Sequence, residues 1–377
     1  MAWYFFINSS FFLGVIIFTE YFFTITQPNK QRGLYRCCLP NSKNKKYKPL
    51  LKTIRMKKKL MLLINAAVSL AMVAVIIYFV GLNEMLQQIE RINIPILLLS
   101  ILLLFFMDLT MAYRILFLLR STGVNLRFID VLKAHFVGML AADFTPARSG
   151  YFTTIAVLKY NYNVPSEKAM LSIFGPQIFD FGVKLVAGTI ALFYITVYFL
   201  GIENSWLMFL GVFALLAIVV VMLLILFSER FLSIFSFVEK IPILSRLYAM
   251  TRRMQTHSHV ITKKTVNILI LIAFSWTFKA LSWYAAAKSV GITINTQFPE
   301  VFFYFFLQPL VTILEFLPST TIAGLGLSEG AITIVLSLFG ISAANAMVFA
   351  LVVRFKTTLL HLVSVPEALK MVHKPLA

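Results

Sequence analysis

The chain has 377 residues, of which 60% are hydrophobic and 13% are charged. A soluble globular domain contains roughly 45–50% apolar and about 25% charged residues, so a soluble fold would expose much of this apolar surface to water. The cysteines, Cys37 and Cys38, are adjacent, and this excludes a disulfide framework. The composition therefore indicates a polytopic membrane protein.

The net charge of +19 is concentrated near the N-terminus. Residues 27–59 contain twelve Lys and Arg and no acid, which leaves +7 for the rest of the chain. A basic block beside a transmembrane segment typically marks the cytoplasmic side and contacts anionic lipid. Binding of nucleic acid is the less favoured alternative.

Residues 1–55 are predicted to be an N-terminal extension that precedes a transmembrane domain at 57–372. Residues 3–23 are apolar but include Asn8 and Glu20, and they lack the basic start and cleavage site of a signal peptide. They predict at most a marginal extra span. Met56 is followed by three lysines, as at a natural membrane-protein start, so Met1 and Met56 both stay open as the initiator.

Apolar runs of about 20 residues are long enough to cross a bilayer as helices. The sequence has such runs at residues 60–82, 95–119, 169–200, 206–227, 266–288 and 343–365. Together with residues 3–23 they predict six to seven transmembrane helices. Gly175 and Pro176 predict a bend in the run 169–200.

Two further apolar regions, 128–160 and 301–340, are broken at residues 143–150 and 317–326. Their halves are short for a crossing and suit re-entrant hairpins, although kinked spans are the alternative. The positive-inside rule puts the loop 27–59, the loop 228–265 and the C-terminus in the cytoplasm. That orientation requires one hairpin to enter from each side of the plasma membrane.

Residues 95–200 and 266–365 then form two halves of opposite orientation, each consisting of a span, a hairpin and a span. The predicted fold is an all-α polytopic membrane protein with two oppositely oriented re-entrant hairpins in an inverted repeat. Broken segments at corresponding positions of inverted halves are typical of transporters, with the site near the midplane.

Ionisable residues within membrane segments are candidate functional residues, because burying a charge in lipid is costly. Asp180 and Lys184 are four residues apart and can form an ion pair on one helix face, with either a structural or a functional role. Asp108, Arg114 and Lys279 are interpreted as structural or snorkelling residues.

The two hairpin tips carry the more specific signals. Thr145 and Pro146 have the pattern of a helix N-cap followed by proline, which places Arg148 at the start of the returning helix. In the second tip, Ser328 is the predicted cap and Glu329 follows it. Two helix N-termini with a nearby arginine can bind an anion such as a lipid phosphate, with Glu329 balancing Arg148. The alternative is that the Gly and Pro residues only shape turns.

No metal or cofactor is predicted. His257 and His259 have no acidic or Cys partner nearby in the sequence. His135, His361 and His373 are interpreted as isolated. The spacing of Gly324 and Gly326 differs from a dinucleotide-binding fingerprint.

The tip motifs resemble the lysylphosphatidylglycerol synthase transmembrane region, also called the flippase-like domain family, over about residues 57–372. Residues 317–331 are similar to its P…GGxGxxEG element, and residues 146–150 to its P-x-R-x-G-E, with Tyr151 in place of the acid. Arg354 falls where the family has an arginine in the next span. Asp180 matches the last position of its E-R-x-x-D, with Pro176 and Gln177 replacing Glu and Arg.

The resemblance implies a lipid translocase that moves an anionic phospholipid or a lipid-linked glycan between leaflets, without enzymatic residues. An intramembrane transferase using an acid such as Glu329, and a non-catalytic scaffold, are the alternatives. The expected partners are membrane lipids and not nucleic acid, and a homodimer stays open. The predicted substrate-binding residues are Thr145, Pro146, Arg148, Gly150, Asp180, Pro318, Gly324, Gly326, Ser328, Glu329 and Arg354.

Overall fold

The computed structural model describes residues 82–200, 258–295, 298–316 and 325–373, together with residue 78 and scattered positions between 213 and 255. The N-terminal extension 1–55, nearly all of the expected span 60–82 and most of 206–227 lie outside the described residues. Pro318 and Gly324 lie outside them as well.

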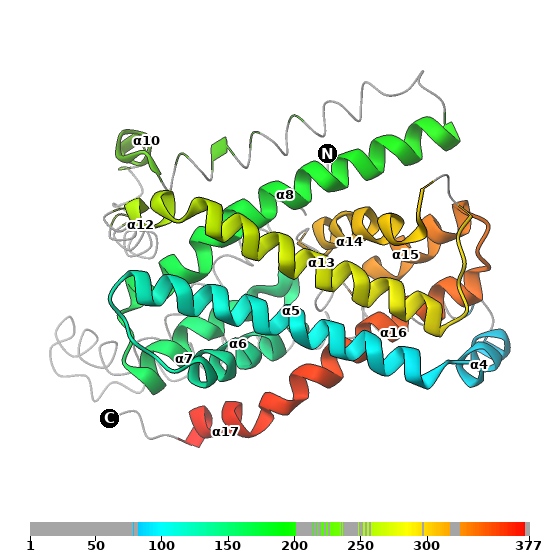
Figure 1. Cartoon of the computed structure of the whole chain (residues 1–377), viewed down its shortest axis with the longest axis horizontal. Helices are drawn as coiled ribbons and strands as arrows, with labels where there is room; N and C mark the ends of the chain where they lie inside the picture. Colours follow the sequence, from blue (N-terminus) through cyan, green and yellow to red (C-terminus); the bar gives the residue numbers. More distant parts are fainter. Residues whose placement is uncertain are drawn as a thin grey trace, which may run out of the picture.

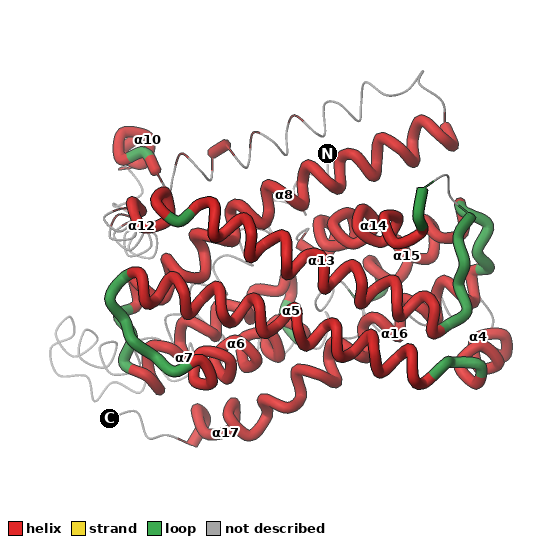
Figure 2. The backbone as a smooth tube through the Cα atoms, viewed as in Figure 1, coloured by secondary structure: helices red, strands yellow, loops and turns green. Residues whose placement is uncertain are grey.

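The regular structure of the described residues is helical, without a strand (Figures 1 and 2). In chain order the main helices are α4 (Leu82–Glu90), α5 (Ile94–Ser121), α6 (Phe128–Asp143), the 3₁₀ helix η2 (Pro146–Phe152), α7 (Thr153–Tyr162), α8 (Ser166–Leu200), α13 (Thr265–Ser289), α14 (Glu300–Phe316), α15 (Leu327–Leu338), α16 (Ala343–His361) and α17 (Val365–His373). Short helices α10 (Glu229–Ile234), α12 (Ser258–Lys263) and η5 (Leu362–Ser364) connect them.

Four described helical segments are long and apolar enough to cross a membrane: Ile94–Ser121, Ser166–Ala191, Thr265–Ser289 and Ala343–Leu369. They correspond to the expected spans 95–119, 169–200, 266–288 and 343–365. Large apolar side chains on α5, such as Leu98 and Leu102, are exposed on the surface, as expected for a face that contacts lipid. The fold is that of an all-helical polytopic membrane protein.

The long helices α5 and α13 lie side by side through the middle of the molecule (Figure 1). The Asn93 N–H, just before α5, donates to the Ser289 carbonyl at the end of α13, at 2.8 Å. Each of the Ser100 and Ser282 hydroxyls donates to the other residue's carbonyl at 2.7 Å. The two helices are therefore antiparallel, the relationship that two halves of opposite orientation require.

Both broken regions form pairs of shorter helices that pack on each other. In the first, α6 contacts η2 and α7, and in the second α14 contacts α15. The 16 residues of α6 extend about 24 Å, against about 42 Å for the 28 residues of α5. Figure 1 shows the two pairs toward opposite ends of the long axis. Their entry into a membrane from one side each stays a prediction.

Glycines allow the first pair to pack closely. A Cβ on Gly150 would lie 2.2 Å from the Ala141 carbonyl oxygen, and one on Gly138 would lie 1.8 Å from the Thr154 Oγ1. Real Cβ atoms do not approach other atoms so closely, so neither position accepts a side chain without movement of its neighbour. Gly150 therefore fixes the distance between η2 and α6.

The hydrophobic interior consists of two clusters. The first is built from α6, α7, the C-terminal part of α5 and the first part of α8, and the second from α14, α15 and α16. Helices α5 and α13 link them: Ile268 and Ile272 at the start of α13 belong to the first cluster, and Trp283 near its end belongs to the second. Contacts of α8 with α14 and of α16 with α6 also join the halves.

Helix α8 is continuous through Pro176. The neighbouring Gly175 faces Ile261, where a Cβ would lie 1.7 Å from the Ile261 Cδ1. The small residue thus makes room for the side chain of α12 that packs against α8.

Candidate functional site

The first tip begins where α6 ends, at Asp143. Thr145 occupies the predicted N-cap position, and Pro146 begins the returning helix, which starts as a 3₁₀ turn. The Thr145 hydroxyl accepts from the Gly150 N–H at 2.6 Å and donates to the Ala141 carbonyl at 2.9 Å. Thr145 therefore ties the tip back to α6, whereas an α-helical cap would bond two or three residues ahead.

Arg148 has a left-handed backbone, with φ at +53°. This conformation costs a non-glycine residue roughly 1–2 kcal/mol, and such strain is concentrated at functional sites. Its Nη2 lies 3.6 Å from Asp143 Oδ1, and both side chains are largely buried. The tip thus holds a guanidinium inside the bundle, beside an acid of the same hairpin.

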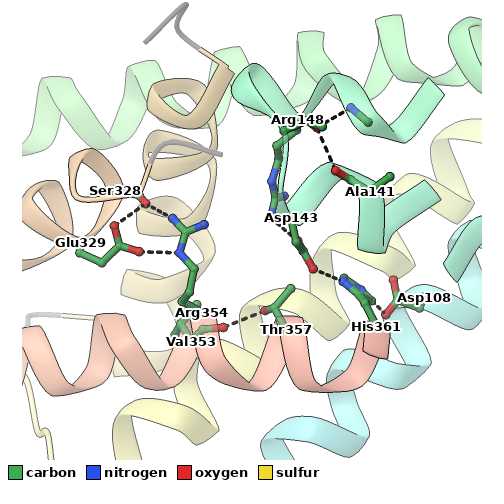
Figure 3. Close-up of polar contacts among 12 residues, drawn as sticks. Asp108, Ala141, Asp143, Arg148, Ser328, Glu329, Val353, Arg354, Thr357 and His361 are labelled. Atoms are coloured by element: carbon green, nitrogen blue, oxygen red, sulfur yellow. Dashed lines mark hydrogen bonds and ion pairs between the residues drawn. The ribbon is translucent and has the colours of Figure 1, made fainter. Parts of the chain in front are cut away.

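Asp143 is also part of a buried Asp–His network (Figure 3). His361 Nδ1 on α16 lies 2.6 Å from Asp143 Oδ2, and His361 Nε2 lies 3.4 Å from Asp108 Oδ2 on α5. His135 Nε2 on α6 lies 3.1 Å from Asp108 Oδ1. The side chains of Asp108, His135 and His361 have no exposed surface.

This network corrects one interpretation of the sequence: His135 and His361 are not isolated, because each contacts a buried carboxylate. Of the two readings of Asp108, structural or snorkelling, its place between the two imidazoles excludes snorkelling. The signal in the sequence was the position of these residues within apolar helices, since a buried ionisable group needs a partner.

At the second tip, Gly326 is the N-cap of α15, with φ at +85°. The Glu329 carboxylate accepts from the Gly326 N–H at 2.6 Å and from the Ser328 hydroxyl at 3.1 Å. The prediction that Ser328 caps this helix is therefore wrong. Ser328 instead accepts from Arg354 Nη2 at 2.6 Å, because its place in the first turn of α15 faces α16.

Arg354 on α16 completes the second tip. Its Nε donates to Glu329 Oε1 at 2.5 Å. The expectation that Glu329 balances Arg148 is therefore not met, since Glu329 pairs with Arg354 and Arg148 pairs with Asp143. The reason is the position of α16, which places Arg354 next to Glu329, and both residues belong to the second half of the chain.

The same helix serves both tips. Arg354 and His361 are seven residues apart, or about two helical turns, and so lie on one face of α16. Figure 3 shows Arg354 reaching to Ser328 and Glu329 and His361 reaching to Asp143 and Asp108. Helix α16 thus contacts the acidic residues of both hairpins: Arg354 contacts Glu329, and His361 contacts Asp143.

Asp180 lies on α8, buried, and accepts from Lys184 Nζ at 2.7 Å and from Gln177 Nε2 at 3.3 Å. This confirms the expected ion pair. Arg114 on α5 and Lys279 on α13 are also close enough to interact electrostatically with Asp180. Asp180 therefore neutralises part of a larger basic region.

Lys356 on α16 is fully buried. Its Nζ donates to the Ser100 and Ser282 hydroxyls at 2.5 Å and to the Ser282 carbonyl at 2.8 Å. The sequence offered no local signal for these contacts, which join α16 to α5 and α13.

Beside these charges lies an apolar groove of about 420 Å³ between α8, α13 and α14. Ile178, Val183, Leu269, Trp276 and Phe306 are among the side chains that line it. Within the described part of the chain, no three His, Cys, Asp or Glu side chains are arranged to hold a metal ion.

The fold and these sites define a polytopic helical membrane protein whose broken helices carry paired charges in the interior. The family model of the lysylphosphatidylglycerol synthase TM region matches residues 62–364. The chain belongs to this family, which confirms the resemblance inferred from the tip motifs.

A relative from Pyrococcus horikoshii, UPF0104 membrane protein PH1989, is 24% identical over 179 residues. The alignment covers 46% of this chain and 51% of the relative, so the chain matches about half the length of that protein. The family supports a membrane function related to lipids.

Proposed function

We propose that this protein is a lipid translocase. It moves an anionic phospholipid or a lipid-linked glycan between leaflets, and the headgroup phosphate binds between the two tips beside α16. The observation that carries the proposal is a pair of largely buried arginines, Arg148 and Arg354, one at each tip and each beside a carboxylate.

An uncompensated charge in the membrane interior costs several kcal/mol by rough estimate, so a buried arginine that leaves its carboxylate needs an anionic partner in its place. Arg148 and Arg354 each have a planar fork of donors that matches a phosphate group. Each already pairs with a carboxylate, and a phosphate can replace that carboxylate as the two halves move. The arginine then keeps an anionic partner throughout the exchange.

The groove between α8, α13 and α14 suits an acyl chain, because its lining residues are apolar. It runs beside the α8 segment that carries Asp180 and Lys184. A lipid with its tail in this groove would place its headgroup next to basic side chains. The arrangement of antiparallel halves supports movement of one half against the other around a central site.

The test is leaflet exchange of labelled phosphatidylglycerol in liposomes that contain the purified protein. We expect exchange with the wild-type protein, and a loss of roughly 10- to 100-fold with Arg148→Ala, since a hydrogen bond to a charged group contributes about 1.5–3 kcal/mol. Arg148→Lys should recover only part of the rate, because an ammonium cannot bind phosphate with a bidentate fork.

The matched control is Arg127→Ala, which removes an arginine whose side chain is 81% exposed and which pairs with Asp130 at the start of α6, away from the tips. It should leave the exchange rate unchanged. Wild-type rates with Arg148→Ala would rule out the site at the tips. An absence of exchange with the wild-type protein, together with chemical turnover of the lipid in detergent, would replace the translocase by the transferase.

A further inference from the structure

The Asp–His cluster, defined as Asp108, His135, Asp143, Arg148 and His361, shares one residue with the proposed lipid site. Asp143 uses Oδ1 toward Arg148, at 3.6 Å, and Oδ2 toward His361, at 2.6 Å. A phosphate that draws Arg148 away from Asp143 therefore changes the charge next to a buried imidazole. Binding at the tip and protonation of the cluster are coupled through this carboxylate.

The charges of the cluster can be counted. Two carboxylates carry −2 and Arg148 carries +1, so the cluster is neutral when one of its two imidazoles is protonated. His361 Nδ1 hydrogen-bonds to Asp143 Oδ2 at 2.6 Å, and its Nε2 lies 3.4 Å from Asp108 Oδ2 without a hydrogen bond, so two carboxylates flank this ring and we assign the first proton to it. His135 is then the neutral imidazole.

An anionic headgroup at Arg148 adds one negative charge to this neutral cluster. A second proton, on His135, restores neutrality, and buried neutral groups are far less costly than charged ones. His135 Nδ1 lies 3.4 Å from the Tyr151 hydroxyl, and a hydroxyl can donate to the neutral ring or accept from the protonated one. His135 can therefore gain a proton without losing a partner.

We propose that the cluster is a proton-binding site, and that His135 takes up one proton from water with each anionic lipid that binds at Arg148. This rests on the proposed function and adds a coupling ion to it. Lipid and proton then cross the membrane together, and a proton gradient supplies the driving force for transport.

Charged groups around the cluster do not replace the second proton. Arg114 and Asp180 act electrostatically on Tyr151, but they have opposite signs. On α16, Arg354 is paired with Glu329, and Lys356 lies among Ser100 and Ser282. Lys279, from α13, acts electrostatically on Lys356 and on Asp180.

The first experiment uses the wild-type protein in detergent and measures the affinity for phosphatidylglycerol as a function of pH, by native mass spectrometry. Uptake of one proton per bound lipid requires the affinity to fall about tenfold for each pH unit, over the range where the free protein lacks the second proton. Phosphatidylcholine, which has no net charge, should show no such slope. A flat profile for bound phosphatidylglycerol would overturn the proton site and leave the lipid site standing.

The second experiment follows a pH dye in weak buffer as phosphatidylglycerol is added. We expect about one proton per bound lipid for the wild-type protein, and none for His135→Gln. The matched control is Asp130→Asn at the start of the same helix, whose acid pairs with the exposed Arg127 outside the Asp–His cluster and should leave the uptake unchanged.

These outcomes separate the two proposals. If wild-type protein binds phosphatidylglycerol no better than phosphatidylcholine, the translocase and the proton site both fail. If it binds the anionic lipid without proton uptake, or if His135→Gln binds it with full uptake, only the assignment of the proton site fails.

Discussion

The Glu329 carboxylate accepts hydrogen bonds from Gly326, Ser328 and Arg354, and its side chain is 2% exposed. These three donors satisfy the hydrogen-bonding capacity of a carboxylate that is shielded from water. Loss of Arg354 alone leaves an acid that cannot reach water. Glu329 therefore fixes the conformation of the second tip through Gly326 and Ser328, and it also balances the charge of Arg354.

We predict that Glu329→Gln and Arg354→Gln each destabilise the protein by roughly 3–5 kcal/mol, the usual cost of leaving one partner of a buried pair unpaired. The double variant should lose clearly less than the sum, because each change removes the charge that the other leaves behind. Thermal unfolding in detergent measures all three. Additive losses would show that the two side chains do not depend on each other.

Lys356 differs from Arg354, because the three atoms that accept its hydrogen bonds are hydroxyl and carbonyl oxygens rather than carboxylate oxygens. Ser100 and Ser282 also bond to each other's carbonyls, and these bonds do not need the lysine. Replacing a buried charge by an apolar side chain of similar volume is often neutral or stabilising. We therefore expect Lys356→Met to keep or raise Tm, and a fall of many degrees would contradict this account.

At the scale of elements, the first hairpin depends on close contact between η2 and α6. We predict that Gly150→Ala lowers the stability by about 2–3 kcal/mol or more, because the new Cβ would overlap the backbone of Ala141. Transport should be lost as well, since Arg148 lies two residues before the clash.

Gly291→Ala provides the comparison. Gly291 has φ at +77° with open space around it, so alanine there adds only the left-handed backbone cost of about 1–2 kcal/mol. It lies outside the hairpin and should leave transport intact. Equal losses of transport in both variants would mean that the fit of the hairpin is not what positions Arg148.

At the scale of the whole molecule, the orientation of the hairpins in the membrane is open to direct test. After Cys37 and Cys38 are replaced by serine, single cysteines at positions 160 and 298 report on the ends of the two hairpins. We expect a membrane-impermeant thiol reagent to label position 160 from the cytoplasm and position 298 from outside, because only this satisfies the positive loops. Labelling of both from the same side would overturn the opposed arrangement.

Hydropathy and helix-breaking residues were sufficient to predict the four described spans and both breaks. These features are local, since a run of apolar residues and a Gly or Pro within it determine where a helix begins and ends. The antiparallel relation of α5 and α13 followed from counting positive loops. The residues at the tips were also found by local pattern, as Thr145, Arg148 and Glu329 show.

The pairing of the charges could not be predicted in the same way. Asp108 and His361 are 253 positions apart in the sequence and meet because α5 and α16 pack against the same hairpin. The sequence alone suggested that Glu329 balances Arg148, whereas α16 supplies Arg354 to Glu329. Partner choice at this distance depends on tertiary packing, which neither spacing nor residue type encodes.

Helix α13 contributes side chains to both apolar clusters, and this affects how the chain folds while it is being synthesised. Ile261, Ile268 and Ile272 follow the first half in the chain but complete its core. Until the ribosome has made α12, which carries Ile261, and the start of α13, which carries Ile268 and Ile272, the first half leaves apolar surface uncovered between its helices. Partly folded segments of this kind are vulnerable to misassembly and to proteolysis. We therefore expect the newly made first half to become resistant to proteolysis only once α12 and α13 have been made and packed against it.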